Sequence, residues 1–313
     1  MRFAMYSIRI KGILLFFLAF QSLIYGQTQG DKEILETFNY KKDVVYKVIN
    51  GISLEMDIYY PNPDKIKKKN PWMLHVHGGG WRGGDRYKVF RKSFVGTLKS
   101  LLDSGVVCVT IEYRRTRGQS TAYDAVVDAK DAARFLLKNA KEYQLDIKKY
   151  GVWGGSAGGH LSLVTALGEN SDFKGAIKLS KFSPDFKCVV SYFPATSLIN
   201  PKLVPGSLFE NKESYTRILG DSLSNKLALA KQLSPTELLK KKSPPILLLH
   251  GDKDIVLPII NSIYMVEVAK EKNANVELLT IKNAGHSFSG SNISPSMEAL
   301  NEYATNFILS HLK

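Results

Sequence analysis

Apolar and polar positions follow two alternating patterns along this chain. Short, nearly continuous apolar runs predict buried strands, and they lie at 71–76, 106–111, 150–153, 188–193, 246–249 and 276–281. Between them, apolar residues recur at spacings of three and four, which predicts amphipathic helices at 121–143, 259–271 and 296–312. This alternation predicts an α/β fold with a mostly parallel, doubly wound sheet, helices on both faces and ligands at the carboxyl ends of the strands.

The sheet is expected to begin with an antiparallel pair. Residues 44–49 and 52–59 flank Asn50-Gly51, a dipeptide that favours the tight turn of a β-hairpin. Residues 195–235 show little periodicity and several Pro, Gly, Ser and Asn residues. We interpret them as an insertion near the ligand-binding edge, where Phe193, Phe209 and Tyr215 either contact substrate or pack.

The N-terminal segment differs from the rest. Arg2, Arg9 and Lys11 precede the apolar run 13–20, and Gly26 follows, which is the pattern of a signal peptide over residues 1–26. The run is short for a bilayer span, and no cysteine near the junction offers a lipid attachment site. We therefore expect an exported protein, periplasmic or extracellular, with no membrane anchor and a single domain over 27–313.

Candidate chemistry begins at Gly154-Gly155-Ser156-Ala157-Gly158, which stands between a predicted strand and a helix-like stretch. A turn this sharp requires small residues on both sides of the serine. It would expose the Ser156 hydroxyl at a helix N-terminus, where negative charge is favoured. The pattern indicates a nucleophile elbow, the alternative being an ordinary glycine-rich turn.

A second glycine motif, His77-Gly78-Gly79-Gly80-Trp81, follows the strand at 71–76. Consecutive glycines let a chain approach a substrate with its amides directed inward. We expect Gly79 or Gly80, together with Ala157, to form an oxyanion hole, with a merely flexible loop as the alternative. Trp81 would either line an acyl pocket or pack the loop.

Metal binding is the weaker interpretation of this region. His75 and His77 are spaced as two ligands on one strand could be, but the further ligands of known metal motifs are missing. We expect neither a metal nor a cofactor.

A base and an acid follow in the order that this architecture requires. His286 stands directly after the last predicted strand and is the candidate general base, ahead of His250, His160 and His311. For the acid that orients it, Asp254 is preferred because its loop can reach the histidine. Asp252 is expected to tie down its own loop.

The segments HGGGW (77–81), GGSAGG (154–159), HGDKDIVLP (250–258) and AGHSF (284–288) together resemble the α/β-hydrolase superfamily. Over roughly residues 40–312, the chain resembles the acetyl xylan esterase and feruloyl-esterase-like group that deacylates plant polysaccharides. The resemblance implies an α/β-hydrolase fold with Ser156, Asp254 and His286 as the catalytic triad.

Two positions depart from the superfamily's usual pattern. Glu112 stands where an aspartate usually precedes the Tyr-Arg pair, here Tyr113-Arg114. This change affects a supporting loop. Gly155 stands where hormone-sensitive-lipase relatives carry an aspartate, which disfavours that branch.

Charge and cysteine content limit the partners. The formal net charge is +14, and three of the basic residues lie in 1–26, which leaves +11 without that segment. The lysine runs at 65–69 and 240–242 lack interleaved aromatic residues, so we expect solvated loops and no nucleic-acid binding. An anionic polysaccharide remains a candidate partner. Cys108 and Cys188 fall in apolar strands and are expected to be core thiols.

These observations predict an exported serine esterase that removes small acyl groups, foremost acetyl, from carbohydrate or another small ester. A serine peptidase or an arylformamidase on the same scaffold is the alternative enzyme. The leader disfavours the formamidase, and the absence of a propeller domain disfavours the peptidase. From another class, an inactive hydrolase fold could serve as a binding module.

Overall fold

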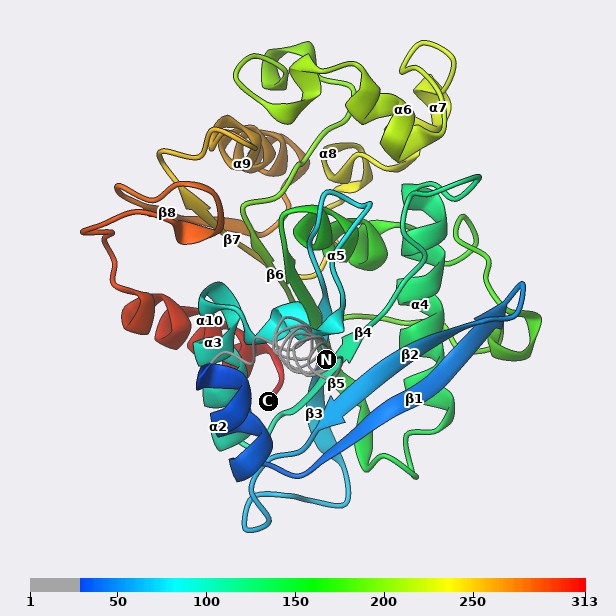
Figure 1. Ribbon diagram of the computed structural model, residues 1–313, viewed down its shortest axis with the longest axis vertical. Coiled ribbons are helices and arrows are strands. Elements are labelled where there is room, and N and C mark those ends of the chain that lie inside the picture. The colour runs from blue at the N-terminus through cyan, green and yellow to red at the C-terminus, as the bar shows by residue number, and fades with distance from the viewer. Residues whose placement is uncertain (1–28) are drawn as a thin grey trace, which may run out of the picture.

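The computed structural model describes residues 29–313, so the predicted signal peptide lies outside the described residues. One eight-stranded sheet runs through the molecule in the order β1-β2-β4-β3-β5-β6-β7-β8 (Figure 1). Its strands are β1 (Tyr40–Ile49), β2 (Ile52–Tyr59), β3 (Asn70–Val76), β4 (Val107–Ile111), β5 (Leu145–Gly155), β6 (Val189–Tyr192), β7 (Ile246–Gly251) and β8 (Val276–Ile281). β2 pairs antiparallel with β1 and β4, and the remaining neighbours are parallel. This is the α/β-hydrolase arrangement predicted from the sequence, including the antiparallel start.

Helices cover both faces of the sheet. Those of the described residues are α2 (Gln29–Thr37), α3 (Lys92–Asp103), α4 (Ala122–Lys138), α5 (Ala157–Leu167), α6 (Glu213–Leu219), α7 (Leu227–Gln232), α8 (Pro235–Leu238), α9 (Ile260–Lys272) and α10 (Met297–His311). Buried side chains of α4, α5 and α9 join one hydrophobic core, and those of α2, α3 and α10 join the other. The two cores fix the sheet between layers, so the carboxyl ends of its strands are held in place.

Several predicted boundaries were wrong, among them the start of the first strand, which was predicted at residue 44 and lies at Tyr40. The helix predicted for 121–143 ends at Lys138, because Asn139 turns its side-chain amide back onto the Phe135 carbonyl at 2.9 Å. The strand predicted for 150–153 spans Leu145–Gly155, although its residues 147–149 are exposed and interrupt the apolar run. Local apolar patterns therefore marked the centres of these elements and missed their ends.

The hairpin and the cysteines are as predicted. Asn50 and Gly51 have φ values of +50° and +77°, the left-handed conformation that a two-residue hairpin turn requires. Cys108 and Cys188 are buried and free, and β3 and β5 lie between their strands.

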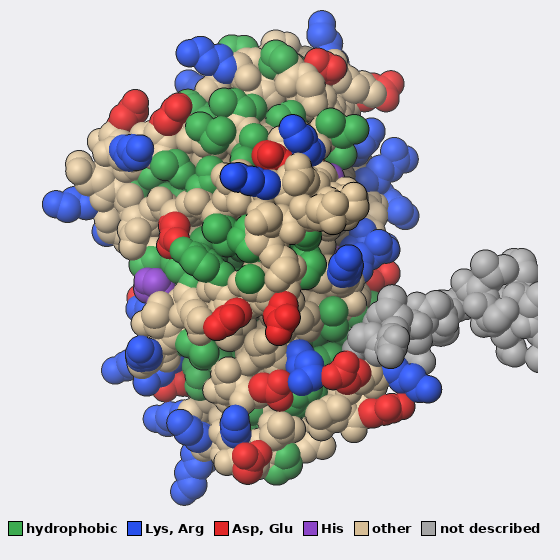
Figure 2. Space-filling view, turned by 90° about the vertical axis from the view of Figure 1, so that its left-hand side faces the viewer, with side chains coloured by type: hydrophobic (Ala, Val, Ile, Leu, Met, Phe, Trp, Pro, Cys, Tyr) green, Lys and Arg blue, Asp and Glu red, His purple; other side chains and the backbone are tan. Residues whose placement is uncertain are grey.

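Residues 195–235 contain short helical turns, among them α6 and α7, and lie beyond the carboxyl ends of the strands (Figure 1). No helix within residues 29–313 is long and apolar enough to cross a membrane. On the face shown in Figure 2, basic side chains are interspersed with acidic ones.

Candidate active site

The turn between β5 and α5 holds Ser156 in a strained conformation, with φ +57° and ψ −125°. A Cβ atom at Gly154 or Gly158 would lie 2.3 or 2.1 Å from the Val76 carbonyl oxygen, so both positions require glycine. The Ser156 N–H donates to the Tyr192 carbonyl at 2.9 Å, which ties the turn to β6. The geometry is that of a nucleophile elbow.

The structure brings Ser156, His286 and Asp254 together from the ends of three strands. His286 Nε2 lies 3.0 Å from Ser156 Oγ, and His286 Nδ1 lies 2.7 Å from Asp254 Oδ2. The ionised carboxylate can only accept, so Nδ1 carries the imidazole proton and Nε2 is left to accept the serine hydroxyl. A base in this tautomer can remove the proton of Ser156.

Asp254 is held as an anion. Its Oδ1 accepts from the backbone N–H groups of Val256 and Leu257 at 2.8 and 3.0 Å. Burial alone would raise the pKa of Asp254, but hydrogen bonds from His250, His286 and Leu257 outweigh it and hold the pKa well below its usual range.

Asp252 does not reach the site. It is exposed, and its carboxylate accepts no hydrogen bond from any group within residues 29–313. The expectation that it ties down its own loop was therefore wrong, because backbone bonds hold that loop: Asp252 N–H donates to Ile281 and Lys253 N–H donates to Ala284.

His250 lies behind the acid and was considered from sequence only as a weaker base. Its Nε2 is 2.7 Å from the Leu257 carbonyl and 3.4 Å from Asp254 Oδ2, and its Nδ1 is 2.7 Å from Ser262 Oγ. The carbonyl can only accept, so Nε2 carries a proton and donates to Leu257. The buried His250 thus supports the loop and the carboxylate that orients His286. Its place at the end of a predicted buried strand was the only sequence signal for this role.

The glycine loop packs against the serine. A Cβ atom at Gly78 would lie 2.6 Å from the Gly155 carbonyl oxygen and 3.4 Å from Ser156 Cβ. Gly79 and Gly80 both have positive φ, +136° and +59°. Among the described residues, the N–H groups of Gly79, Gly80 and Ala157 have no acceptor. Uncommitted amide donors thus lie in the loop that packs against the serine and directly after the serine itself, where an oxyanion hole would need them.

Glu112 and Tyr113 support this loop from behind. The Tyr113 hydroxyl donates to the His77 carbonyl at 2.7 Å, and its ring stacks on the His77 imidazole. Glu112 accepts from the Arg86 N–H and the Arg115 guanidinium, each at 3.0 Å. The glutamate thus binds two arginines, and its carboxylate comes within 3.8 Å of the His77 imidazole at the start of the loop.

His75 and His77 are separately buried. His75 Nδ1 contacts Thr110 Oγ1 at 3.3 Å, whereas His77 Nδ1 donates to the Gly78 carbonyl at 2.9 Å. Burial lowers the pKa of each to about 3, which keeps both neutral. Residues 29–313 contain no cluster of three or more His, Cys, Asp or Glu side chains that could hold a metal.

The aromatic residues near the site are mostly buried. Trp81 is 1% exposed and donates its indole N–H to His160 Nδ1 at 3.1 Å, so contact with a substrate stays a prediction. Phe209 and Tyr215 are buried and pack together. Phe193 was not predicted to touch the triad, yet its ring packs edge-on against His286 with centroids 4.8 Å apart. Its backbone φ of +40°, rare for a bulky residue, is not readable from the sequence.

The 195–235 insertion contacts the site at two places. Leu208 N–H donates to Val256 in the acid loop at 2.9 Å, and the Leu233 carbonyl lies 2.7 Å from His160 Nε2. The insertion can therefore influence the acid loop directly and the helix that follows the nucleophile through His160.

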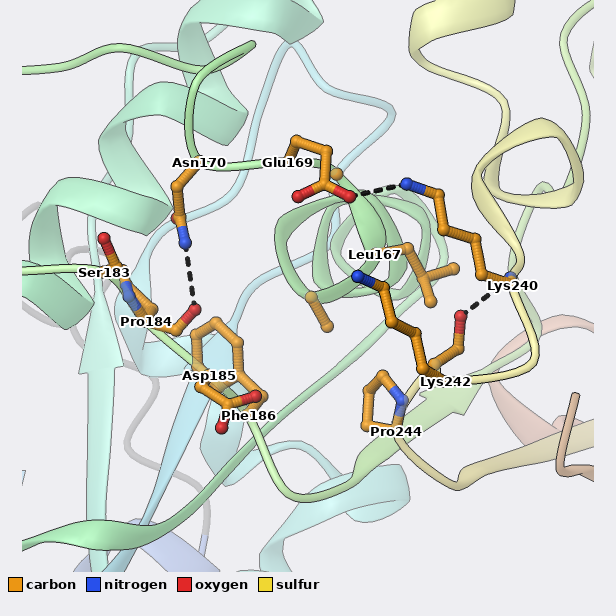
Figure 3. Close-up of a pocket in the computed structure, with 13 residues that line it drawn as sticks. Leu167, Glu169, Asn170, Ser183, Pro184, Asp185, Phe186, Lys240, Lys242 and Pro244 are labelled. Carbon is orange, nitrogen blue, oxygen red and sulfur yellow. Dashed lines mark hydrogen bonds and ion pairs between the residues drawn. The ribbon is translucent and has the colours of Figure 1, made fainter.

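A separate hollow of about 280 Å³ lies at the end of α5 remote from Ser156 (Figure 3). Lys240 and Glu169 point toward one another there and form an ion pair of 2.5 Å, while Asn170 donates to the Pro184 carbonyl. These groups largely satisfy one another, and the triad is not among the lining residues.

Comparison with known proteins agrees with this fold. The structure is similar to that of a thermophilic esterase from Thermogutta terrifontis determined with bound propionate, with a TM-score of 0.70, 24% identity, and 88% of this chain and 94% of that one covered. By sequence, the chain is 25% identical to esterase LipQ of Mycobacterium tuberculosis over 225 residues, which is 71% of this chain and 51% of the relative.

A rice protein described as a probable isoprenylcysteine alpha-carbonyl methylesterase is 27% identical over 258 residues, 79% of this chain and 59% of its own length. The chain thus spans about half the length of the curated relatives it matches. The family model described as BD-FAE matches residues 56–268, which include the glycine loop, the serine elbow and Asp254. The chain belongs to the BD-FAE family of α/β-hydrolase proteins.

Proposed function

We propose that this protein is a serine carboxylic ester hydrolase in which Ser156, His286 and Asp254 form the catalytic triad. The continuous hydrogen-bond chain from Asp254 through His286 to Ser156 carries the proposal. The printed names of the sequence relatives, esterases and methylesterases, support the same reaction class.

The geometry accommodates a two-step reaction without a cofactor. Ser156 Oγ attacks the ester carbonyl while His286 Nε2 takes its proton and then gives it to the leaving alcohol. Amides of Gly79 or Gly80 and of Ala157 stabilise the oxyanion. Water next attacks the acyl-enzyme, its proton passes to His286, and Ser156 is released with the proton restored.

We further propose that the substrate is a small acyl ester on carbohydrate, with acetyl the first candidate, and that the enzyme is exported. The leader pattern of residues 1–26 and the resemblance to polysaccharide deacylases support this choice. Basic loops such as 240–242 would favour a polymer that carries carboxylates.

A substrate panel tests the proposal. Purified protein is assayed for an acyl-enzyme burst with p-nitrophenyl acetate, and then for acid release from acetylated xylan, acetylated pectin, feruloyl esters and dipeptide anilides. We expect a burst, and acetate release from at least one polymer. No burst and no turnover would favour the inactive binding module, whereas turnover of anilides alone would favour a peptidase.

A series of salt concentrations tests whether the basic loops attract an anionic polymer. Exposed charges are screened beyond about 10 Å at 0.1 M ionic strength, so kcat/KM on acetylated pectin should fall as salt rises. The neutral p-nitrophenyl acetate should respond little. The same salt response for both substrates would remove the role of the basic loops.

A further inference from the structure

His160 sits between three parts of the site. It stands four residues after Ser156 in α5, and its backbone N–H donates to the Ser156 carbonyl at 3.0 Å. Its side chain is fully buried. One ring nitrogen contacts Trp81 of the glycine loop and the other contacts Leu233 at the end of α7. A single imidazole therefore joins the nucleophile helix, the glycine loop and the insertion.

The two partners fix the state of this imidazole. An indole N–H can only donate, so Nδ1 of His160 must accept from Trp81 at 3.1 Å. A backbone carbonyl can only accept, so Nε2 must carry the proton and donate to Leu233 at 2.7 Å. A second proton on the ring would place an N–H against the indole N–H. Burial lowers the pKa of His160 to about 4, which agrees with a neutral ring.

The bond to Trp81 acts on the donors of the oxyanion hole. Trp81 directly follows Gly79 and Gly80, has φ +60°, and its carbonyl accepts from the Thr116 N–H at 2.9 Å. The other donor, Ala157, belongs to the first turn of the helix that carries His160. The hydrogen bond between Trp81 and His160 thus links the glycine loop to the helix that begins with Ala157. An error of about 1 Å in such an arrangement can cost about 100-fold in rate.

We propose that His160 is a positioning residue that sets the oxyanion hole by holding Trp81 in place, with the insertion fixing the His160 ring from behind. This inference rests on the proposed ester hydrolysis and assigns Trp81 a role through its indole N–H.

A pair of substitutions separates the two ring nitrogens. His160→Gln can keep a donor toward Leu233 but loses the acceptor for Trp81, whereas His160→Asn can keep the acceptor and lose the donor. We expect His160→Gln to lower kcat on p-nitrophenyl acetate by about 10- to 100-fold with little change in KM. His160→Asn should lose less. Equal kcat losses for the two would contradict the proposal.

Trp81→Phe removes the indole donor and keeps an aromatic ring. We expect a kcat loss of the same size as in His160→Gln, and a double variant no worse than the more affected single one, because both changes break one bond. Affinity for a trifluoromethyl ketone, which engages the oxyanion donors, should fall in parallel. A higher KM with kcat kept would instead make Trp81 a wall of the substrate pocket.

Trp72→Phe is the matched control. Trp72 is also fully buried, and its indole N–H donates to a backbone carbonyl, that of Asp146, at 2.9 Å, at the start of β3 and away from the serine. It should lower thermal stability as Trp81→Phe does while kcat is retained. A comparable kcat loss in Trp72→Phe would show that the Trp81 effect is only structural.

Nitrogen NMR of the unsubstituted protein provides a test that does not depend on folding of a variant. The His160 ring should show a protonated Nε2 and an unprotonated Nδ1, and the opposite tautomer would overturn the proposal. An inactive Ser156→Ala variant alongside unaffected His160→Gln and Trp81→Phe variants would remove this inference and leave the proposed function standing. Activity kept in Ser156→Ala would remove the proposed function itself.

Discussion

The candidate site has two halves: an oxyanion half, made of the glycine loop and Ala157, and an acid half, made of the loop that carries Asp254. A buried histidine supports each half, but the two histidines contact the site through different ring nitrogens. On the oxyanion side, His160 contacts the site through Nδ1, which accepts from Trp81, and is fixed from behind through Nε2. On the acid side, His250 contacts the acid loop through Nε2 and is fixed from behind through Nδ1 by Ser262.

The difference follows from what each half must supply. The oxyanion half presents neutral amide donors on a glycine loop, which need a fixed backbone, so its histidine holds the loop through a side-chain donor. The acid half presents an anion, which needs donors close by, so its histidine directs its N–H toward the acid loop. One residue type thus performs two tasks, and the nitrogen that faces the site decides which.

The largest expected loss of activity is at Ser156 and His286, which lie between the oxyanion half and the acid half. Ser156→Ala or His286→Ala should lower kcat by about 10⁴- to 10⁶-fold, because each removes a member of the proton-transfer chain. Turnover of p-nitrophenyl acetate by the purified variants measures this, with circular dichroism as the control for folding. Near-normal activity in Ser156→Ala would mean that Ser156 is not the nucleophile, so that neither half has the role assigned to it.

Next in size is the acid half. Asp254→Asn should lower kcat on the order of 10⁴-fold, because the amide cannot hold the His286 tautomer that leaves Nε2 free. Asp252→Asn is the matched control, since its carboxylate is exposed and away from His286. A larger loss in Asp252→Asn than in Asp254→Asn would refute the assignment of the acid.

Stability against pH checks the charge of Asp254 independently of activity. Its pKa is depressed in the folded protein, so its charge stabilises the fold above the pKa of an unfolded aspartate, about 4. That contribution is lost as pH falls through the folded value. The difference in thermal midpoint between wild type and Asp254→Asn should therefore be constant at neutral pH and shrink in acid, and an invariant difference would argue against a buried anion.

The oxyanion half is expected to show a smaller loss. Gly79→Ala should lower kcat by about 10²- to 10³-fold with KM little changed, because its Cβ would lie 2.2 Å from the Gly83 carbonyl oxygen and displace the loop. Gly51→Ala is the matched control, since Gly51 also has a positive φ and its Cβ would meet open space, but it lies in the hairpin turn between β1 and β2. Steady-state kinetics separate the two, and a loss confined to KM would make the loop a substrate-binding element.

Prediction from sequence succeeded where the signal was local. The glycines of the elbow and the loop form short sequence motifs, although the contacts that require them reach across the fold, as Gly154 and Gly158 do to the Val76 carbonyl. The buried strands are continuous apolar runs, so both features were readable. The short turns of residues 195–235 lack an apolar repeat, and α4 ends where Asn139 caps it, so neither was readable.

The supports of the site were not predictable because they are non-local. Trp81 and His160 are 79 positions apart, and His160 and Leu233 are 73 apart. Hydrogen bonds over such separations follow from how the helices pack on the sheet, and the sequence carries no periodic trace of them. The comparison of the two histidines therefore depends on the structure alone.

The smallest expected effect is the sharpest test of that comparison. At His250 the contact that matters for the site is made by Nε2, so His250→Gln, which can keep a donor there, should retain more activity than His250→Asn, the reverse of the order at His160. We expect His250→Asn to lower kcat by about tenfold, because one hydrogen bond toward a charged group is lost. The loss should not be larger, since Asp254 keeps the N–H groups of Val256 and Leu257 and the His286 bond. Steady-state kinetics of the four variants, each compared at matched thermal stability, gives the two orders side by side. The same order at both positions would mean that side-chain size, rather than the nitrogen used, decides how each histidine supports the site.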